Sequence, residues 1–475
     1  MLSAVALAAT AAPTRHQFAV VFDGGSTGTR VYVYRYELPA PGAPPALPTL
    51  HAERSWNMKV KPGLSTFAGT PGGPGLGYMR PLLDFARAIV PAEQQRSAVL
   101  LLRATAGMRL VSPPAAQRIY DSLYEAVRTH GAFSPTRALF GTLSGEDEGV
   151  FGWLAVNHLL LQAHRIRPAQ LGDVGALDLG GGSTQITFAL PPEAVGTAAV
   201  EASLPGRSVR VFTRSHLGFG NKQVLAALTP AEASACLAAG ANASWEPDKR
   251  WGLQLDGARQ LHGRGAFAKC EAGVMRVLAT NGAMGRGAQP AVAGHHFVAM
   301  SLFYYAAHFA QASGHLRGGS PSYAVRELRA AAAALCAEDG AALEHRMAGK
   351  DPLTPTEAIR WRCFDLTYAS ALLSRGYGFS DDATVDFLGE IDGNEVEWTR
   401  GALLSHLATE ERSQRGGGGL GGGAISTGEI GALLVLALGL CALYAFVRRR
   451  RKAATGNPPY GRLDDRWLAR RQARE

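Results

Sequence analysis

Two glycine-rich segments, each opened by an aspartate at the end of an apolar run, hold the residues best suited to chemistry. The first, Asp23–Arg30, reads DGGSTGTR, and the second, Asp178–Gln185, reads DLGGGSTQ; 155 residues separate the two aspartates. Glycine lets backbone N–H groups approach an anion without interference from Cβ, and Ser and Thr hydroxyls add donors. An aspartate fixed at a strand end can hold a divalent cation, usually through water. Two such loops facing each other would bind a polyphosphate and its metal ion from both sides.

A third segment, Ser144–Trp153, places Glu146, Asp147 and Glu148 in sequence before an apolar stretch. Three acids at a helix start can simply interact favourably with the helix dipole. The functional interpretation is that one carboxylate takes a proton from an attacking water, which requires hydrogen-bond reach to that water. The linear sequence leaves both interpretations open.

The first loop also fits G-x-S-x-G, the nucleophile elbow of serine hydrolases, which requires a strand, a sharp turn and then a helix. Here Val31–Tyr36 follows with the alternating pattern of a strand, so a serine esterase is disfavoured. A glycine-rich loop without a ligand is the commoner alternative for one loop alone. Two matched loops on matched strands argue against it.

The elements that must position these loops form a pattern that occurs twice. In the first half we expect strands at Phe18–Phe22, Val31–Tyr36, Val99–Leu102 and Ala138–Leu143, with helices at Pro113–His130 and Glu146–His164. In the second half we expect strands at Ala176–Leu179, Ile186–Leu190 and Val209–Thr213. Each half thus begins with strand, loop, strand, and the mixture of strands and helices predicts an α/β fold.

The net charge of +9 belongs mostly to one end of the chain. Residues 448–475 hold ten Lys and Arg against three Asp and Glu, so the other 447 residues carry about +2. No nucleic-acid-binding motif is present, and we expect no nucleic-acid partner.

Ile430–Val447 is an uncharged apolar run, followed at once by Arg448–Lys452 and preceded by the glycine-rich residues 416–423. Eighteen residues in a helix span about 27 Å, close to the thickness of a membrane core. The positive-inside rule puts the basic end in the cytosol. We therefore expect a single-pass anchor with the rest lumenal or extracellular, in the endomembrane system (such as the Golgi) or at the plasma membrane; residues 1–15 would form a possible signal segment.

Apart from Cys441 in the apolar run, four cysteines remain: Cys236, Cys270, Cys336 and Cys363. Three pairings are possible, and we favour Cys236–Cys270 with Cys336–Cys363 because each closes a local loop. Asn242-Ala243-Ser244 is a glycosylation sequon, consistent with a lumenal location.

The chain resembles the apyrases, the nucleoside triphosphate diphosphohydrolase family. Five ordered segments carry the resemblance: Asp23–Arg30, Ala104–Arg109, Ser144–Trp153, Ala176–Phe188 and Phe297–Tyr305. It covers about residues 18–410 and implies two actin-like lobes with RNase H-like cores and an active site in the cleft between them. It also implies hydrolysis of the terminal phosphate of nucleoside di- and triphosphates with Ca²⁺ or Mg²⁺.

By the same resemblance, Glu148 matches the catalytic base, and Ser183 and Gln185 match residues that position the water. Asp23, Asp178 and Thr105 match the residues around the hydrated metal. The matched phosphate-binding residues are Ser26, Thr27, Gly28, Thr29, Arg30, Gly180, Gly181, Gly182 and Ser183. Tyr304 or Tyr305, together with Arg375, match places where the family sandwiches the base.

These predictions divide the chain into lobe I (residues 16–144 and 389–412), lobe II (145–388), a stalk (413–429), a membrane helix (430–447) and a basic tail (448–475). Two rivals share the expected superfamily: an ATP-switch protein of the chaperone kind, and a sugar kinase. The Ser144–Trp153 segment disfavours both, because neither needs a water-activating glutamate at that place.

Overall fold

The computed structural model describes residues 16–417 except for 26, 39–46, 192–193, 195–198, 205–206, 246–258, 281–283 and 285–288. Ser26 of the first loop therefore lies outside the described residues. So do the possible signal segment 1–15, residues 418–429 of the stalk, the apolar run 430–447 and the tail 448–475. The chain divides into compact units of residues 1–410 and 411–475, and both large sheets belong to the first unit.

The first sheet has six strands in the order β3-β2-β1-β5-β6, with β4 also paired to β2. Its strands are β1 (Gln17–Gly24), β2 (Thr29–Glu37), β3 (Thr49–His51), β4 (Asn57–Val60), β5 (Val99–Ala104) and β6 (Phe140–Thr142). β1 and β2 form an antiparallel hairpin, whereas β5 runs parallel to β1. The hairpin turn and the end of β5 consequently meet at one edge.

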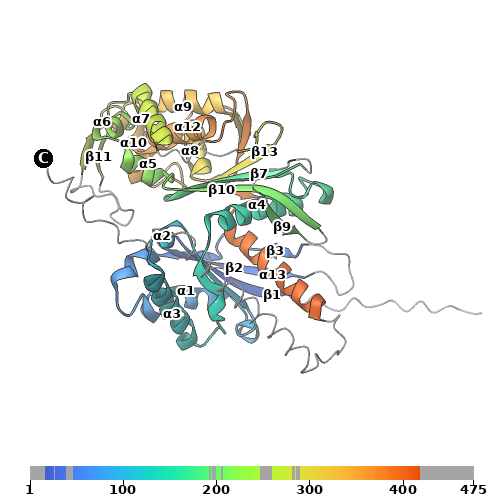
Figure 1. The fold of residues 1–475 in the computed structure, drawn as a ribbon. Coiled ribbons are helices and arrows are strands. Elements are labelled where there is room, and N and C mark those ends of the chain that lie inside the picture. The colour runs from blue at the N-terminus through green and yellow to red at the C-terminus, as the bar shows by residue number, and fades with distance from the viewer. Residues whose placement is uncertain are drawn as a thin grey trace, which may run out of the picture. The chain divides into compact units, whose positions relative to one another are not determined.

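Both faces of this sheet are covered, as the alternation along β1 requires. Val20 and Phe22 pack in a core with α1 (Gly75–Ile89) and α3 (Pro113–His130). Ala19 and Val21 face the other way, against Leu403, Leu404 and Leu407 of α13 (Trp398–Gly417). Figure 1 shows α13 along one side of β1, β2 and β3, with α1 and α3 on the other.

The second sheet has seven strands in the order β14-β15-β13-β7-β8-β10-β9. They are β7 (Val174–Leu179), β8 (Ser183–Ala189), β9 (Val200–Leu204), β10 (Arg207–Leu217), β13 (His296–Ser301), β14 (Ser322–Ala324) and β15 (Thr384–Phe387). Here β7 and β8 form the hairpin, and β13 runs parallel to β7. The arrangement of β1, β2 and β5 in the first sheet is thus repeated.

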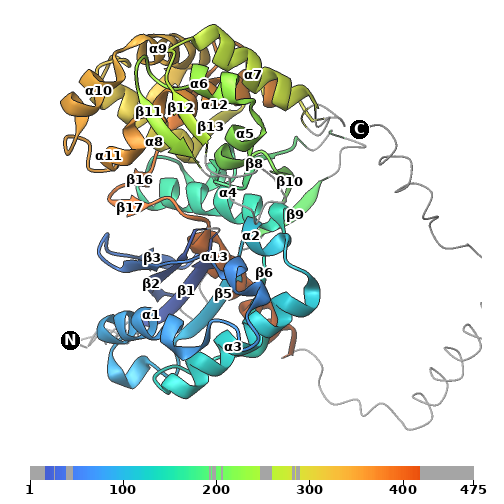
Figure 2. The ribbon, with the colours of Figure 1, turned by 90° about the vertical axis from the view of Figure 1, so that its left-hand side faces the viewer.

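This second sheet is also covered on both faces. Ala176, Val298 and Val211 pack against Trp153 and other apolar residues of α4 (Gly145–Gln162). The opposite face carries a larger core with α7 (Phe267–Thr280), α8 (Leu302–Ala312), α9 (Val325–Ala337) and α12 (Arg362–Ala371). Figure 2 shows α4 on the side of β8 and β10 away from these helices.

Shorter elements complete the fold. The helices are α2 (Ala106–Arg109), α5 (Asn221–Ala227), α6 (Pro230–Ala235), α10 (Gly340–Met347) and α11 (Thr356–Ile359). The strands form two small pairs, β11 (Asn242–Trp245) with β12 (Arg259–His262), and β16 (Glu390–Ile391) with β17 (Asn394–Glu395).

The repeated strand-loop-strand pattern is confirmed, and so is the helix over Pro113–His130. The predicted strand over residues 138–143 is shorter, because Arg137–Leu139 form a single 3₁₀ turn before β6. The predicted strand Val209–Thr213 is the middle of the longer β10. The predicted division into two lobes stays a prediction, although the strands of the two sheets come from residues 17–142 and 174–387.

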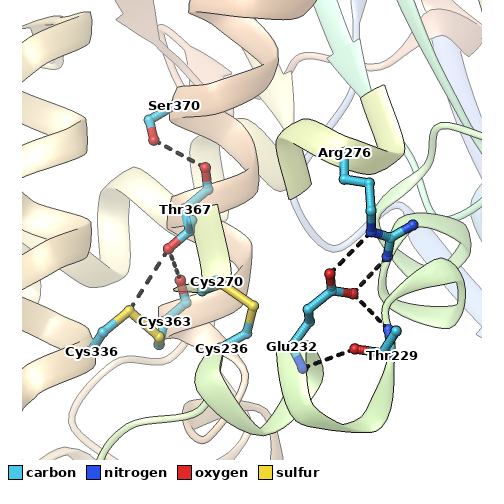
Figure 3. Close-up of a disulfide and its surroundings, with 9 residues drawn as sticks. All are labelled: Thr229, Glu232, Cys236, Cys270, Arg276, Cys336, Cys363, Thr367 and Ser370. Atoms are coloured by element: carbon cyan, nitrogen blue, oxygen red, sulfur yellow. Dashed lines mark hydrogen bonds and ion pairs between the residues drawn. A yellow bond between two sulfur atoms is a disulfide. The ribbon is translucent and has the colours of Figure 1, made fainter. Parts of the chain in front are cut away.

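Both disulfides form with the predicted pairing, Cys236–Cys270 and Cys336–Cys363 (Figure 3). The first ties the end of α6 to α7, and the second ties α9 to α12. Asn242 of the sequon is exposed at the start of β11.

The apolar run 430–447 lies outside the described residues. Within the part of the chain that the structure describes, no helix combines the length and apolarity that a membrane crossing needs.

The crossing of α4 and α13 joins the helices that cover the two sheets. A Cβ added to Gly401 would overlap the backbone of Phe151, including its carbonyl oxygen. Backbone cannot move aside as the end of a side chain can, so only glycine permits this approach.

We expect Gly401→Ala to lower the free energy of unfolding by about 1–3 kcal/mol or more, the usual cost of overpacking. Thermal denaturation of the purified protein measures it. Gly77→Ala is the matched control, because a Cβ there in α1 has nothing within 4 Å and should stabilise by about 0.5–1 kcal/mol. Equal melting temperatures for the two variants would contradict the tight crossing.

Candidate active site

The first glycine-rich loop is the turn between β1 and β2. A Cβ on Gly28 would overlap Val60 O, so β4 passes too close for any other residue. Lys59 Nζ donates to Thr27 Oγ1 at 2.9 Å. Thr105 N donates to Gly24 O at 3.2 Å, which joins the loop to the start of α2. Thr27, Gly28 and Thr105 therefore lie together at the ends of β1 and β5.

Two residues predicted to bind phosphate are engaged elsewhere. Thr29 is fully buried, and its Oγ1 accepts a hydrogen bond from Tyr78 Oη at 2.8 Å. Arg30 Nη1 donates to Tyr32 Oη at 2.9 Å and lies 3.4 Å from Glu395 Oε1. Because β2 alternates, Thr29 faces the core; Arg30 meets the acids that precede α13. The phosphate-binding role of Thr29 and Arg30 stays a prediction.

The second loop, Gly180–Gly182, is the turn between β7 and β8. Gly180 N donates to Ser183 O at 2.9 Å, and Gly182 O accepts from Gly218 N at 2.9 Å. A Cβ on Gly220 would overlap the backbone of Gly181 and Gly182, so the segment after β10 lies directly against the loop. The loop is thus fixed from both sides.

The two loop aspartates present buried oxygens that lack partners. Asp23 Oδ1 and Asp178 Oδ1 have no hydrogen-bond partner among the described residues. Burial raises the pKa of Asp23 to about 6, although Arg30 and Lys59 oppose this and Asp178 adds to it. Burial likewise raises the pKa of Asp178. Buried carboxylates are stabilised by pairing with a cation, so these two residues fit the divalent ion that the sequence predicts.

Ser301 contacts Asp178 and has a strained backbone conformation. It ends β13 with φ 57° and ψ −127°, and its side chain hydrogen-bonds Asp178. A non-glycine residue with positive φ costs free energy and is common at functional sites. In the part of the chain described, no three His, Cys, Asp or Glu side chains converge as a direct metal site.

Glu148 reaches this region because α4 lies unusually close to the second sheet. Gly145, Gly149 and Gly152 line the helix face toward the sheet. A Cβ on Gly149 would lie 2.6 Å from the hydroxyls of Thr187 and Thr213. Ser144 begins the helix, its Oγ accepting from Asp147 N at 2.9 Å. The cap and the three glycines together fix Glu148 one turn into the helix, beside β8.

The Glu148 carboxylate is 8% exposed and is paired with Arg109. Arg109 Nη2 donates to Glu148 Oε2, while its Nε and Nη2 donate to Leu143 O at 2.8 Å and Ser144 O at 3.0 Å. Burial raises the pKa of Glu148 to about 7, and the Arg109 charge opposes the rise. A carboxyl group with a pKa near neutrality is suited to exchange protons with water.

Gln185 joins the other predicted catalytic residues to this carboxylate. Its Nε2 lies 3.2 Å from Glu148 Oε2, 2.9 Å from Ser183 Oγ and 3.1 Å from Ser215 Oγ. Ser183 and Gln185 are buried and two apart on β8, so both point to the α4 side. The structure therefore brings Glu148, Ser183 and Gln185 together.

Sequence reasoning assigned no role to four residues that border this site: Arg109, Ser215, Ser301 and Glu397. Burial raises the pKa of Glu397, and the charge of Glu395 is the next largest cause. Asp23 and Asp178 also raise it, so Glu397 lies close enough to both aspartates to interact with them electrostatically. Arg109 and Ser301 lie in Ala104–Arg109 and Phe297–Tyr305, two segments that carry the family resemblance, and this was the sequence signal that could have identified them. No such signal marks Ser215 and Glu397, because only the packing of β10 and α13 brings these two residues to the site.

The residues predicted to hold a base have no direct contact across the predicted sandwich among the described residues. Tyr304 and Tyr305 are half-buried neighbours on α8, with ring centroids 5.5 Å apart. Tyr304 also lines a cavity of about 220 Å³ with His308, Tyr323 and Glu390. Arg375 is exposed on the turn after α12, and among the described residues neither tyrosine has a ring or hydrogen-bond contact with it. The base-binding role of all three stays a prediction.

Paired hairpin loops, two aspartates with buried oxygens and a buried carboxyl group with a pKa near neutrality define a candidate phosphohydrolase. A model of the GDA1/CD39 (nucleoside phosphatase) family matches residues 9–415. The chain belongs to this family.

Its relatives include the nucleoside diphosphate phosphatase ENTPD5 of Homo sapiens, 31% identical over 82% of this chain and 87% of that protein. The nucleoside-diphosphatase uda-1 of Caenorhabditis elegans is 29% identical over 82% of this chain and 81% of that protein. Among solved structures, a nucleoside triphosphate hydrolase of Neospora caninum superposes with a TM-score of 0.55. That match has 17% identity and covers 83% of this chain and 93% of that one, which supports the mixed α/β fold.

The ion pair with Arg109 should set the pH at which Glu148 loses its proton. Replacing Arg109 by Gln removes the nearby positive charge, so the pKa of Glu148 rises further. A base works only when deprotonated, and the acid limb of the kcat/KM profile should move up by about 1–3 pH units.

The measurement is phosphate release from a nucleoside diphosphate between pH 5 and 9 at one fixed metal concentration. Arg109→Lys keeps the charge and should shift the limb less than Arg109→Gln. An unchanged limb in Arg109→Gln would exclude Glu148 as the group that titrates.

Proposed function

We propose that this chain hydrolyses the terminal phosphate of nucleoside di- and triphosphates by direct attack of water. The observation that carries the proposal is a buried carboxylate, Glu148, hydrogen-bonded to Gln185 beside two aspartates. Each aspartate has a buried oxygen without a partner among the residues that the structure describes. Membership of a nucleoside phosphatase family supports the reaction class. The names of two relatives make nucleoside diphosphates the first substrates to test.

The two loops and Glu148 would have different roles in the reaction. Backbone N–H groups of Gly28, Gly181 and Gly182 would spread the charge of the transferred phosphoryl group over fixed donors. Gln185 and Ser183 would orient the attacking water, and Glu148 would accept its proton. The positive charge of Arg109 favours the ionised form of Glu148 and opposes the rise in pKa that burial causes.

Asp23 and Asp178, with Thr105 beside them, would hold Ca²⁺ or Mg²⁺ through water. When bound, the cation neutralises part of the phosphate charge in the transition state. The buried oxygen of each aspartate that has no partner within the described part of the chain supports this assignment.

We also propose the finer architecture that the sequence predicts. Two actin-like lobes would be built on the two sheets, with the nucleotide between them and its base near Tyr304 or Tyr305. The run 430–447 would anchor the protein by one membrane helix, with the catalytic part lumenal or extracellular. The two disulfides and the exposed Asn242 support such a compartment.

Glu148→Gln tests the role of the base. The amide keeps the shape and a hydrogen bond with Arg109 but cannot accept the proton, so kcat should fall by about 10²–10⁴-fold. Nucleotide affinity, measured by calorimetry, should stay close to that of the unmodified protein. Release of phosphate from ADP, UDP or GDP without an acceptor separates hydrolysis from kinase activity, and a variant with the original rate would remove Glu148 from the mechanism.

Asp178→Asn tests the metal assignment. Loss of one carboxylate charge should raise the Ca²⁺ or Mg²⁺ concentration needed for half-maximal rate by about 10–100-fold. Asp173→Asn is the control, because Asp173 is exposed just before the same strand. The same metal requirement in both variants would contradict a metal role for Asp178.

A further inference from the structure

The second loop rests on a short segment that follows β10, here called the brace, Gly218–Asn221. Gly218 N donates to Gly182 O at 2.9 Å, and Asn221 N donates to Gly180 O at 3.1 Å. Gly220 lies against the backbone of Gly181 and Gly182 with no room for a side chain. The brace therefore fixes both ends of the loop whose N–H groups would hold the phosphate.

The brace is in turn held by α12 at two points. Tyr368 Oη donates to Phe219 O, and Asn221 Nδ2 donates to Asp365 Oδ1 at 3.2 Å. Asp365 and Tyr368 are three residues apart and so share one face of the helix. The side chain of Asn221 is thus the polar link between the brace and the Asp365 carboxylate.

Asp365 belongs to a chain of buried polar contacts that runs away from the loop. Arg362 Nη1 donates to Asp365 Oδ2 at 3.3 Å, and Arg362 Nη2 donates to Thr354 Oγ1 at 2.7 Å. Thr354 Oγ1 in turn donates to Asp351 Oδ2 at 2.7 Å. All four residues are at most 5% exposed.

Stability alone does not account for these buried charges. Removing charged groups from water costs free energy that their mutual attraction often fails to recover, and apolar replacements of similar volume are frequently as stable. Burial accordingly raises the pKa of Asp365 despite the neighbouring Arg362. What the contacts do provide is a single fixed orientation for the carboxylate that receives Asn221.

We propose that Asp365 and Asn221 are positioning residues for phosphoryl transfer, which hold the Gly180–Gly182 loop in register with the terminal phosphate. This inference rests on the proposed function and deepens it. Loop donors misplaced by about 1 Å can cost about 10²-fold in rate. The misplaced donors would stabilise the transition state less, because the three equatorial oxygens of the transferred phosphoryl group carry the negative charge there.

The test is Asn221→Ala, which deletes the side-chain link and leaves the backbone contact with Gly180. We expect kcat to fall by about 10–100-fold, with the KM for a nucleoside diphosphate changing little. Inhibition by orthovanadate, whose trigonal form imitates the transferred phosphoryl group, should weaken by a similar factor. The melting temperature should stay close to that of the unmodified protein.

Asp365→Asn gives the opposite pattern. It keeps an oxygen acceptor for Asn221 but leaves Arg362 without a buried counter-charge, so the melting temperature should fall while kcat is largely retained. Ser370→Ala on the same helix is the matched control, because that hydroxyl donates to Thr367 O within α12 and has no other partner among the described residues (Figure 3). It should leave both kcat and orthovanadate inhibition unchanged.

The outcomes separate the two proposals. If the unmodified protein releases no phosphate from nucleoside diphosphates, the proposed function fails. If it is active and Asn221→Ala retains its kcat and orthovanadate inhibition, the positioning role is wrong. Loss of melting temperature without a kinetic change in Asn221→Ala would assign the link to stability alone and overturn the inference.

Discussion

The burial of three carboxylates, Asp23, Asp178 and Glu148, is the constraint on which the rest of the site depends. Each raised pKa shows that the interior disfavours the charged form, so each charge needs a nearby compensating group. Arg109 supplies it for Glu148. For the two aspartates, one carboxylate oxygen each has no hydrogen-bond partner among the described residues, which is the basis of the divalent cation proposed above.

The duplicated hairpin decides where such groups can lie. Both sheets are covered by helices on both faces, so the strand interiors are apolar, as the alternation of Val20 and Val21 between two cores illustrates. Polar chemistry is confined to strand ends and turns. The two hairpin turns lie beside parallel strands, β5 and β13, whose ends bring Thr105 and Ser301 next to the aspartates. The same arrangement of a hairpin turn beside a parallel strand thus occurs in both sheets.

The sequence predicted what local pattern and spacing encode. The hairpins follow from apolar runs around glycine-rich turns, and the disulfide pairing follows from local loop closure. Glu148, Ser183 and Gln185 were singled out and do lie together. The sequence did not predict contacts between distant segments. Ser215, for example, contacts Gln185 because β10 pairs with β8. The loop pattern also did not reveal that Thr29 contacts Tyr78 and that Arg30 contacts Tyr32.

Arg109 and Glu148 belong to elements of different sheets: α2 follows a strand of the first sheet, and α4 covers the second. The ion pair between them therefore couples the proton affinity of Glu148 to the contact between these two elements. If Arg109 moved away from Glu148, burial would act on the carboxylate without the opposing positive charge, and the pKa of Glu148 would rise further. Any movement at this contact would thus change the pH at which Glu148 loses its proton.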